Sequence, residues 1–472
     1  MAKKLTAFSA VICVLLFAAL FAACKKGQQV NISSQEFVSG SYIQNGDTLN
    51  SKNGSNGRSI EGTLQAGQTY YLSADYANAT VNSGDTLVVQ SGVRVLIVGS
   101  NSSSIGTEGH APALVIDGTF LCLGTKTNPI LFSVADASLK SNPALDPQDP
   151  NTDPAFKGYW GGIQGSAGSG DIIIKWTRLE YLGGIAPATA ASRPGQAYYG
   201  VFLNNPNANF VLEDCWLYGS NNDMIRPAGC KYEIFRNTFE KVGFSAGECV
   251  NVKSGCIGDI AYNLVVGGTG NAFKTANAGG LSPQSNMNCY NNTVLTTGFR
   301  QAKAGEGGSI DFENDGRGLA YNNLLVDCAY GLGVRGGGGT TPAADTANTR
   351  YGYTYNYGDD TAITDQFLPV GFITVQQTSD INGGDATTPG ANNPNFVNYP
   401  LPLPVTTNFN NANYVGSYNL RLQSGSPAIG KGYTGFAPYA MVKVDPVFGA
   451  TEITLPGKDI GAYQSDGSGN QH

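Results

Sequence analysis

The chain has 472 residues, of which 63 are glycine, about 13% compared with an average near 7%. Only 13% of the residues are charged, roughly half the usual share, whereas 41% are hydrophobic. This composition excludes a disordered chain, because enough apolar residues are present to form a large core. It also argues against a helical protein, since each glycine costs a helix about 1 kcal/mol. The length allows several ordinary domains or one long solenoid.

Residues 1–23 are typical of a secretory signal peptide. Two lysines at positions 3 and 4 precede an apolar run at 11–20, which is shorter than the roughly 20 residues that a membrane span needs. The small residues before Cys24 resemble the cleavage box of bacterial lipoproteins, in which the cysteine is lipidated and becomes the new N-terminus. We therefore expect a lipid anchor on Cys24 that attaches the chain to a membrane. Ordinary signal cleavage without a lipid is the alternative.

Loss of residues 1–23 removes two lysines and no acidic residue, so the net charge changes from −7 to −9. A negative balance disfavours nucleic acid as a partner. Residues 24–60 are polar and rich in turn formers, and we expect a tether there. Seven cysteines remain once Cys13 and Cys24 are set aside, and no CxxC motif or Cys/His cluster indicates zinc. Cys249 and Cys256 are near enough in sequence to pair.

Short apolar runs alternate with turns from residue 81 onward, as in TLVVQSG, VRVLIVG and NPILFSV. Runs of about five residues with this alternation predict β-strands, and no helical period competes with them. A recurring pattern then places polar residues 23, 26, 29 and 31 positions apart, at Asp214, Asn237, Asn263, Asn292 and Asn323. Repeats of this length predict a β-solenoid, in which each coil covers its neighbour. Stacked Asn side chains can hydrogen-bond along the axis of such a fold.

Segments near both ends of the chain carry a family resemblance. They are SGDTLVVQSGVRVLIVG, ALVIDGTFLCLGTKTNPILFSV and GYWGGIQG at the start, and NPNFVN, YNLRLQSGSPAIGKG and DIGAYQ at the end. In these segments the chain resembles the right-handed parallel β-helix, or pectin-lyase-like, superfamily, and most closely lipoproteins of the Bacteroidetes type. The resemblance implies an outer-membrane lipoprotein that faces the periplasm or the cell surface. It says little about activity, since this architecture hosts lyases, hydrolases, adhesins and inert surface proteins.

The expected organisation is all-β. We expect β-helix coils over 61–335, an extended Gly/Tyr-rich loop or irregular coil over 336–395, and closing coils with a C-terminal cap over 396–472. The Asp359–Asp360 pair falls in the expected loop. It resembles one element of the polygalacturonase motif, but the Gly-His-Gly and Arg-x-Lys elements of that family are absent from the chain.

One strand is rich in carboxylates, in the segment SIDFENDGR. Alternate side chains of a strand share a face, so Asp311, Glu313 and with them Asp315 are predicted to point outward. Three carboxylates on one exposed strand are candidate ligands for Ca²⁺. A solvated outer face produces the same alternation, and that is the simpler interpretation.

A charged residue ends the strand that follows each polar turn, in the segments MIR, VNVK, AFK, IDFE and LGVR. If these segments align, five outward charges stack about 4.8 Å apart along the axis. They are Arg226, Lys253, Lys274, Glu313 and Arg335. Such a ladder suits an acidic polysaccharide lying along the solenoid, whereas the alternative is that long cationic side chains merely shield an exposed edge.

Three function classes follow from the sequence. The favoured one is a non-enzymatic binding or structural role at the cell envelope, with an acidic glycan as the ligand. The second is a polysaccharide lyase acting on uronate-containing glycans, with Lys253, Lys274 or Arg335 as the base and the Asp311/Glu313 group as a calcium site. The third is an adhesin that recognises neighbouring cells.

Overall fold

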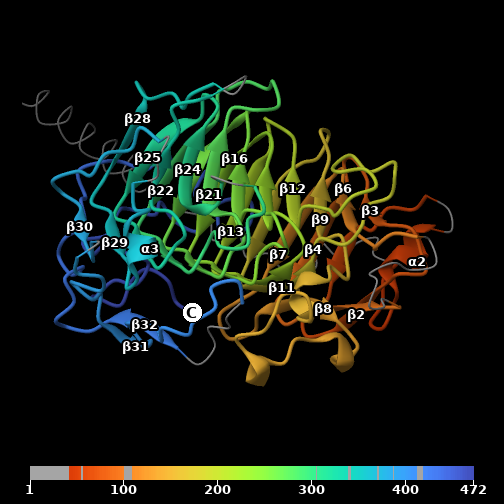
Figure 1. The fold of residues 1–472 in the computed structure, drawn as a ribbon. Coiled ribbons are helices and arrows are strands. Elements are labelled where there is room, and N and C mark those ends of the chain that lie inside the picture. The colour runs from red at the N-terminus through yellow and green to blue at the C-terminus, as the bar shows by residue number, and fades with distance from the viewer. Residues whose placement is uncertain are drawn as a thin grey trace, which may run out of the picture. The chain divides into compact units, whose positions relative to one another are not determined.

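The fold is described from a computed structural model, drawn as a ribbon in Figure 1. The structure describes residues 42–54, 57–99, 109–303, 306–338, 342–368, 372–385, 387–411 and 418–472. The signal peptide expected at 1–23, the lipidation site expected at Cys24 and the first part of the tether expected over 24–60, as far as residue 41, lie outside the described residues. The rest of that segment belongs to the fold, because Ile43, Leu49 and Ile60 are part of the hydrophobic core. None of the helices in the described part has the length and hydropathy needed to span a bilayer.

Three long sheets, built from parallel strand pairs, form a right-handed parallel β-helix (Figure 1). From β1 to β29 each coil adds one strand to each sheet, so neighbours in a sheet are three strands apart in the chain, and β30 then pairs directly with β29. The ten-stranded sheet consists of β1 (Gly62–Leu64), β4 (Thr86–Gln90), β7 (Thr119–Leu123), β10 (Ile172–Lys175), β13 (Asn209–Glu213), β16 (Cys230–Phe235), β19 (Cys256–Ala261), β22 (Asn286–Tyr290), β25 (Arg317–Tyr321) and β28 (Thr349–Gly352). The eleven-stranded sheet consists of β2 (Thr69–Ser73), β5 (Arg94–Val98), β8 (Ile130–Val134), β11 (Thr177–Leu182), β14 (Trp216–Ser220), β17 (Thr238–Glu240), β20 (Leu264–Val266), β23 (Thr293–Leu295), β26 (Leu324–Val326), β29 (Tyr355–Tyr357) and β30 (Ile381–Asn382). The nine-stranded sheet consists of β3 (Ala79–Val81), β6 (Leu114–Ile116), β9 (Ile163–Gly165), β12 (Val201–Leu203), β15 (Ile225–Pro227), β18 (Val250–Val252), β21 (Asn271–Ala276), β24 (Gly308–Glu313) and β27 (Gly333–Val334).

Helices are short and lie at the ends of the coils or between them. The helix α2 (Leu49–Gly54) precedes the first strand, and α3 (Thr361–Thr364) lies between β29 and β30. Three 3₁₀ turns separate β8 from β9: η1 (Ala137–Leu139), η2 (Pro143–Leu145) and η3 (Pro154–Phe156). Within 336–395, the strands β28, β29 and β30 extend two of the sheets. After residue 395 the strands β31 (Phe396–Asn398) and β32 (Asn419–Leu422) pair antiparallel with each other.

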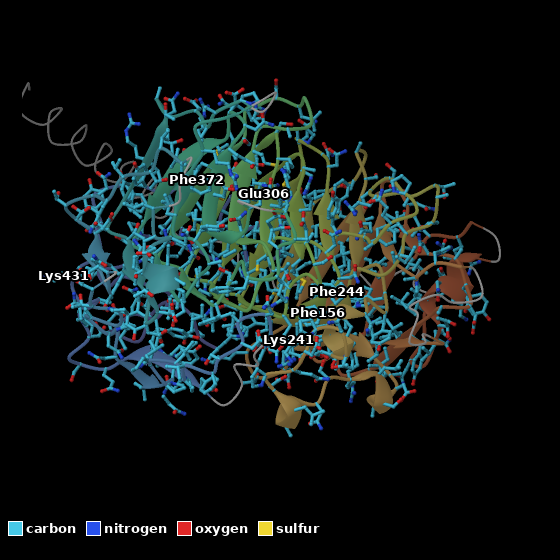
Figure 2. The ribbon with its side chains drawn as sticks, in the orientation of Figure 1. Phe156, Lys241, Phe244, Glu306, Phe372 and Lys431 are labelled. Atoms are coloured by element: carbon cyan, nitrogen blue, oxygen red, sulfur yellow. The ribbon has the colours of Figure 1, made fainter. Side chains whose placement is uncertain are left out.

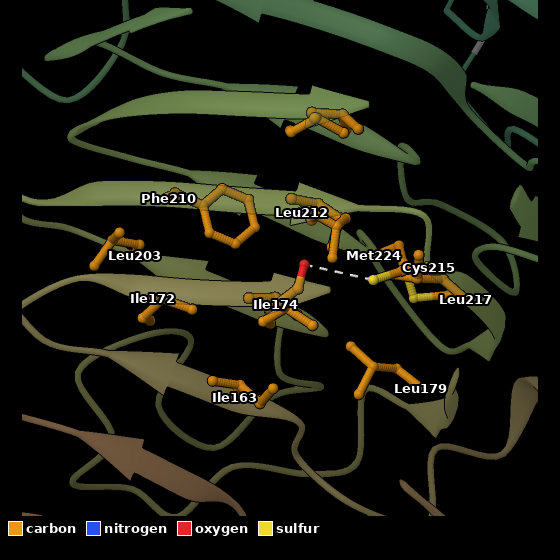
Figure 3. Packing of buried hydrophobic residues seen from close by; sticks show 14 of the residues in the cluster. Ile163, Ile172, Ile174, Leu179, Leu203, Phe210, Leu212, Cys215, Leu217 and Met224 are labelled. Carbon is orange, nitrogen blue, oxygen red and sulfur yellow. Dashed lines mark hydrogen bonds between the residues drawn. The ribbon is translucent and has the colours of Figure 1, made fainter. Parts of the chain in front are cut away.

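The hydrophobic core fills the inside of the coils. Inward side chains from successive strands stack on one another, as Ile172, Ile174, Phe210 and Leu212 do in Figure 3. These four side chains are at most 1% exposed. Stacking of like side chains in register lets each coil bury the apolar face of the next, which is how a solenoid is stabilised.

All seven cysteines of the described residues are free and buried, and Cys249 and Cys256 do not pair with each other. Burial raises the pKa of the Cys122 thiol to about 12. Buried thiols of this kind are unreactive and pack as small apolar side chains. These seven cysteines therefore contribute to the core.

The recurring asparagines form a continuous ladder at one corner of the coils. The side-chain amide of Asn237 donates to Oδ1 of Asn263 at 2.9 Å, and Asn263 donates in the same way to Asn292 at 3.0 Å. Asn292 donates to Asn323 at 3.0 Å. The predicted equivalence of these four residues is confirmed.

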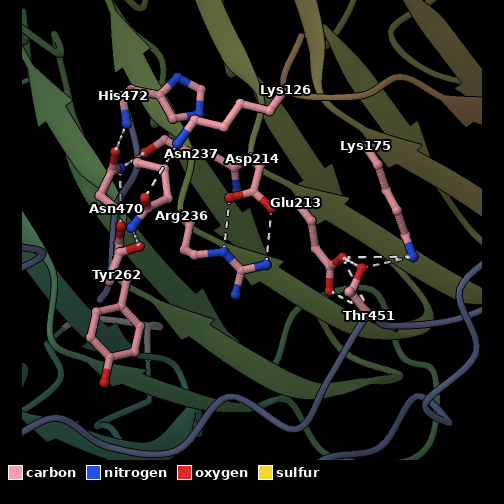
Figure 4. A network of polar contacts seen from close by, with 12 residues as sticks. Lys126, Lys175, Glu213, Asp214, Arg236, Asn237, Tyr262, Thr451, Asn470 and His472 are labelled. Atoms are coloured by element: carbon pink, nitrogen blue, oxygen red, sulfur yellow. Dashed lines mark hydrogen bonds and ion pairs between the residues drawn. The ribbon is translucent and has the colours of Figure 1, made fainter. Parts of the chain in front are cut away.

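The prediction of Asp214 as the first member of this ladder is wrong by one residue. The backbone N–H of Cys215, not of Asp214, donates to Oδ1 of Asn237 at 2.9 Å. Asp214 has a φ of 53° and lies one position earlier, where Arg236 has a φ of 56° in the next coil. The two side chains form an ion pair at 2.8 Å (Figure 4). A left-handed residue thus precedes each ladder position and turns the chain at this corner.

Residues 433–472 are here called the C-terminal strap. As far as Thr451 they cover the outer face of the ten-stranded sheet, and Ala462 then contacts Thr293 of the eleven-stranded sheet. The backbone N–H of Tyr433 donates to Asn322 at 2.7 Å, on a late coil. The N–H of Thr451 donates to Glu213 at 3.0 Å, on a much earlier coil (Figure 4). Irregular backbone laid on a sheet needs acceptors for its N–H groups, and the outward polar side chains of the sheet supply them. The strap therefore uses the polar surface of this sheet.

Candidate functional site

Charged side chains gather on the outer face of the nine-stranded sheet. Val250 pairs in register with Phe273, and Phe273 with Ile310, and all three point into the core. Because side chains alternate along a strand, the residues beside these three point outward. We call this outward group, with two acidic residues just before the strands, the charged patch: Asp223, Arg226, Glu248, Asn251, Lys253, Lys274, Asp311, Glu313 and Arg335.

The charges occupy two rows rather than the single expected row. In the first row Asn251 pairs with Lys274, and Lys274 pairs with Asp311. Lys253 and Glu313 lie two residues further along their strands and belong to the second row. A shift of two residues leaves the inward and outward alternation unchanged, so the pattern of the sequence could not reveal it. The five predicted side chains still share one face.

Carboxylates hold the cations at both ends of the patch. The guanidinium of Arg226 lies 2.6 Å from Asp223, and that of Arg335 lies 2.6 Å from Asp311. Asp311 is 1% exposed, and burial raises the pKa of its carboxyl above the ordinary value although Arg335 opposes the shift. Such charge-assisted pairs fix the planar groups in position.

Lys274 is the centre of the patch and bridges two carboxylates. Its ammonium lies 2.9 Å from Glu313 and 3.5 Å from Glu248. Burial alone would lower the pKa of Lys274, but Glu248 and Glu313 raise it above the ordinary value. The amide of Asn251 completes the network with hydrogen bonds of 3.0 Å to both Asp223 and Glu248. Four acidic and four basic side chains therefore balance in the patch, and the expected uncompensated cationic ladder is not formed.

Asp223, Glu248 and Asn251 are members of the patch that the sequence reasoning missed. Asp223 stands three residues before Arg226, and Glu248 stands three residues before Asn251. The N–H of Glu248 donates to Asp223 at 3.0 Å, so the two acids occupy equivalent places in adjacent coils. An acidic residue that recurs three positions before an outward residue of the strand is therefore the sequence signal that could have revealed these members of the patch.

Lys253 differs from the other cations of the patch. Its ammonium makes no ion pair or hydrogen bond with the residues that the structure describes, and its side chain is half-buried. Burial, together with Arg226 and Lys274, lowers its pKa to about 8. Burial and the charge of Asp223 raise the pKa of Glu248 to about 8. Two groups whose pKa values lie near neutral pH thus belong to one patch, which is a feature of acid–base sites.

The predicted calcium ligands do not converge. Asp311 and Glu313 both face Arg335, at 2.6 and 3.4 Å. Asp315 lies beyond the strand in a turn, with a φ of 56° and an exposed side chain. In the described ranges, no three His, Cys, Asp or Glu side chains are arranged to hold a metal ion.

Aromatic rings lie at both ends of the charged patch. The guanidinium of Arg226 is 4.6 Å from the centre of the Tyr199 ring, which stacks on Phe202 at 5.9 Å. At the other end, Arg335 lies 4.8 Å from the centre of the Phe372 ring, which is labelled in Figure 2. Stacking on an arginine holds each ring beside the network. The site is therefore a polar surface bounded by aromatic side chains.

The two members of the Asp359–Asp360 pair have separate structural contacts. The carboxylate of Asp360 accepts the N–H of Ala362 at 2.7 Å and so caps α3. Asp359 accepts the N–H of Leu403 at 2.5 Å. Neither residue belongs to the charged patch. Comparison of the chain with family models, with curated proteins and with solved structures finds no match.

Proposed function

We propose that the protein binds a carbohydrate of the cell envelope through the charged patch, and that the ligand is an acidic glycan. The observation that carries the proposal is the charged patch itself, which gathers eight ionisable side chains, seven of them joined by ion pairs, in a chain with only 13% charged residues. Sugar hydroxyls both donate and accept hydrogen bonds, so a balanced array of carboxylates and cations suits them.

Lys253 supplies the preference for an acidic sugar. The other cations are already neutralised by carboxylates, whereas the Lys253 ammonium is available to an incoming anion. A single cation fits one carboxylate or sulfate at a time rather than a row of them. The patch therefore recognises one acidic residue of the glycan, with neutral neighbours along the rest of the network.

Binding assays on immobilised acidic polysaccharide test the proposal. Lys253→Met keeps the length of the side chain and removes the charge, so retention should fall by about tenfold or more, as for a lost hydrogen bond to a charged group. Lys431→Met is the matched control, because Lys431 is exposed and lies outside the patch (Figure 2). Equal retention of both variants and the unmodified protein would contradict the proposal.

A polysaccharide lyase is the second candidate, and the lowered pKa of Lys253 favours it. In β-elimination a base removes the proton next to the sugar carboxylate, a double bond forms, the glycosidic C–O bond breaks, and the leaving oxygen takes up a proton from water. Lys253 is the only one of the three predicted bases without a carboxylate partner among the described residues. Incubation with uronate polysaccharides, with and without Ca²⁺, distinguishes the candidates: a sustained rise in ultraviolet absorbance from unsaturated products supports the lyase and rejects binding alone.

The placement of the protein in the cell is part of the proposal. The N-terminal sequence supports a lipid anchor on Cys24, and the end segments support a pectin-lyase-like outer-membrane lipoprotein of the Bacteroidetes type. Mass spectrometry of the N-terminal peptide tests the anchor, since unmodified Cys24 or cleavage elsewhere would overturn it. Protease treatment of intact cells distinguishes the cell surface from the periplasmic side.

A further inference from the structure

A cavity lies on another side of the β-helix, between the eleven-stranded sheet and the last part of the chain. Its volume is about 400 Å³, within the range of about 300–1,000 Å³ that is usual for small-molecule sites. One wall is formed by β14, β17 and β20, and the other by β32 and the end of the C-terminal strap. Aromatic, aliphatic and polar side chains all contribute to the lining, as in many ligand sites.

The floor of the cavity is one outward row of the sheet. Trp216 pairs in register with Thr238, and Thr238 with Leu264. The next member of the row is Thr293, and there the strap closes on the sheet: the N–H of Ala462 donates to Oγ1 of Thr293 at 2.9 Å. The cavity thus begins where close packing between strap and sheet ends.

Two polar groups at the cavity have capacity for a further hydrogen bond or ion pair. The hydroxyl of Thr238 has no hydrogen-bond partner although the residue is only 2% exposed. Arg421 makes no ion pair with any residue in the described segments; its guanidinium lies 5.3 Å from the centre of the Tyr463 ring and 3.5 Å from the carbonyl oxygen of Asn470. A buried hydroxyl without a partner is unfavourable, and the planar guanidinium can make paired contacts with an anion. A ligand that carries a hydroxyl and an anionic group supplies a partner for both the Thr238 hydroxyl and the Arg421 guanidinium.

We infer that this cavity binds a single sugar residue that carries one anionic substituent, either a carboxylate, a sulfate or a phosphate. Arg421 pairs with the anionic group, Thr238 exchanges a hydrogen bond with a ring hydroxyl, and Leu264 faces the carbon skeleton. The cavity is on a different sheet from the charged patch and uses none of its residues. This inference therefore stands or fails independently of the proposed function.

The experiment is calorimetric titration of the purified protein with glucuronic acid, glucose 6-phosphate and N-acetylglucosamine 6-sulfate, with glucose as the neutral reference. At least one anionic sugar should bind, and glucose should bind at least tenfold more weakly. The three ligands differ in the anionic group and so identify which anion the cavity takes. Absence of binding by all three at millimolar concentration, with the protein folded, would overturn the inference.

Two variants connect the binding to the cavity. Arg421→Gln should weaken it about tenfold or more, and Arg421→Lys should restore part of the loss. Thr238→Val removes an unpartnered hydroxyl without changing the side-chain shape, so the protein should stay folded while affinity falls several-fold. Arg350→Gln is the control, because Arg350 is an exposed arginine on β28 that does not line the cavity. Affinity unchanged in both Arg421→Gln and Thr238→Val would place the binding elsewhere and overturn the inference.

Discussion

Replacement of Asn292 by alanine tests the asparagine ladder as a source of stability. Oδ1 of Asn292 accepts the backbone N–H of Asn263 at 2.9 Å and its side-chain amide at 3.0 Å. The Asn292 amide also donates to the carbonyl oxygen of Ile260 at 3.1 Å and to Asn323 at 3.0 Å. The residue is fully buried, so water cannot replace these bonds.

The expected loss follows from the groups left behind. An orphaned buried N–H of Asn263 costs about 1–3 kcal/mol, and the remaining hydrogen bonds contribute about 0.5–1.5 kcal/mol each. The free energy of unfolding should therefore fall by about 3–5 kcal/mol, a large part of the usual total of about 5–15 kcal/mol.

Urea denaturation followed by circular dichroism gives the measurement, with Asn207→Ala as the control. Asn207 is exposed, and its replacement should change the free energy by less than about 0.5 kcal/mol. A loss below about 1 kcal/mol for Asn292→Ala would refute the reasoning, because the amide would then not be satisfying buried groups.

Two further predictions concern buried ionisable groups. Lys241 is fully buried between Asp146 at 2.6 Å and Asp153 at 2.8 Å. Lys241→Met should therefore lower the free energy of unfolding by about 3–5 kcal/mol. A denaturation midpoint equal to that of the unmodified protein would show that these two ion pairs do not stabilise the fold. Burial and Asp259 raise the pKa of Glu233 to about 9. A folded-state pKa above the unfolded value means that stability falls as the pH rises from about 4 toward 9, since the unfolded chain loses the proton first. Glu233→Gln should therefore raise the melting temperature more at pH 8 than at pH 5, and an equal shift at both pH values would argue against the raised pKa.

The fold was predictable because its signals are local. Runs with a period of two residues indicate strands, and the spacing of Asn237, Asn263, Asn292 and Asn323 gives the length of each coil. The error at Asp214 has a physical cause. In that coil Cys215 occupies the ladder position, where only its backbone N–H is needed as a donor. The pattern of polar residues therefore matched the preceding residue, Asp214, instead.

The arrangement of the charged patch was predictable only in part. The sequence placed Arg226, Lys274 and Arg335 on one outward face, because the alternation along each strand decides it. It could not show that these cations are neutralised, since two of their partners, Asp223 and Glu248, come from turns before the strands. The path of the C-terminal strap was equally hidden, because its contacts join residues more than 100 positions apart.

Lys253 also sets the pH range of the proposed binding. Its pKa of about 8 means that most of the side chain is charged at pH 6.5 and little of it at pH 9.5. The pKa of Glu248 is also about 8, so proton loss from Glu248 contributes to any pH effect. Lys253→Met retains Glu248 and therefore isolates the part that belongs to the lysine.

The affinity for an acidic polysaccharide, measured between pH 6.5 and 9.5 at constant ionic strength, tests the central claim most directly. For the unmodified protein the affinity should fall as the pH rises through about 8, because Lys253 loses the proton that gives it a charge. Lys253→Met should bind weakly at all pH values, with a much smaller dependence on pH. An unmodified protein whose affinity is constant over this range, or a Lys253→Met variant that follows the same curve, would contradict the assignment of the charged patch as the glycan-binding site.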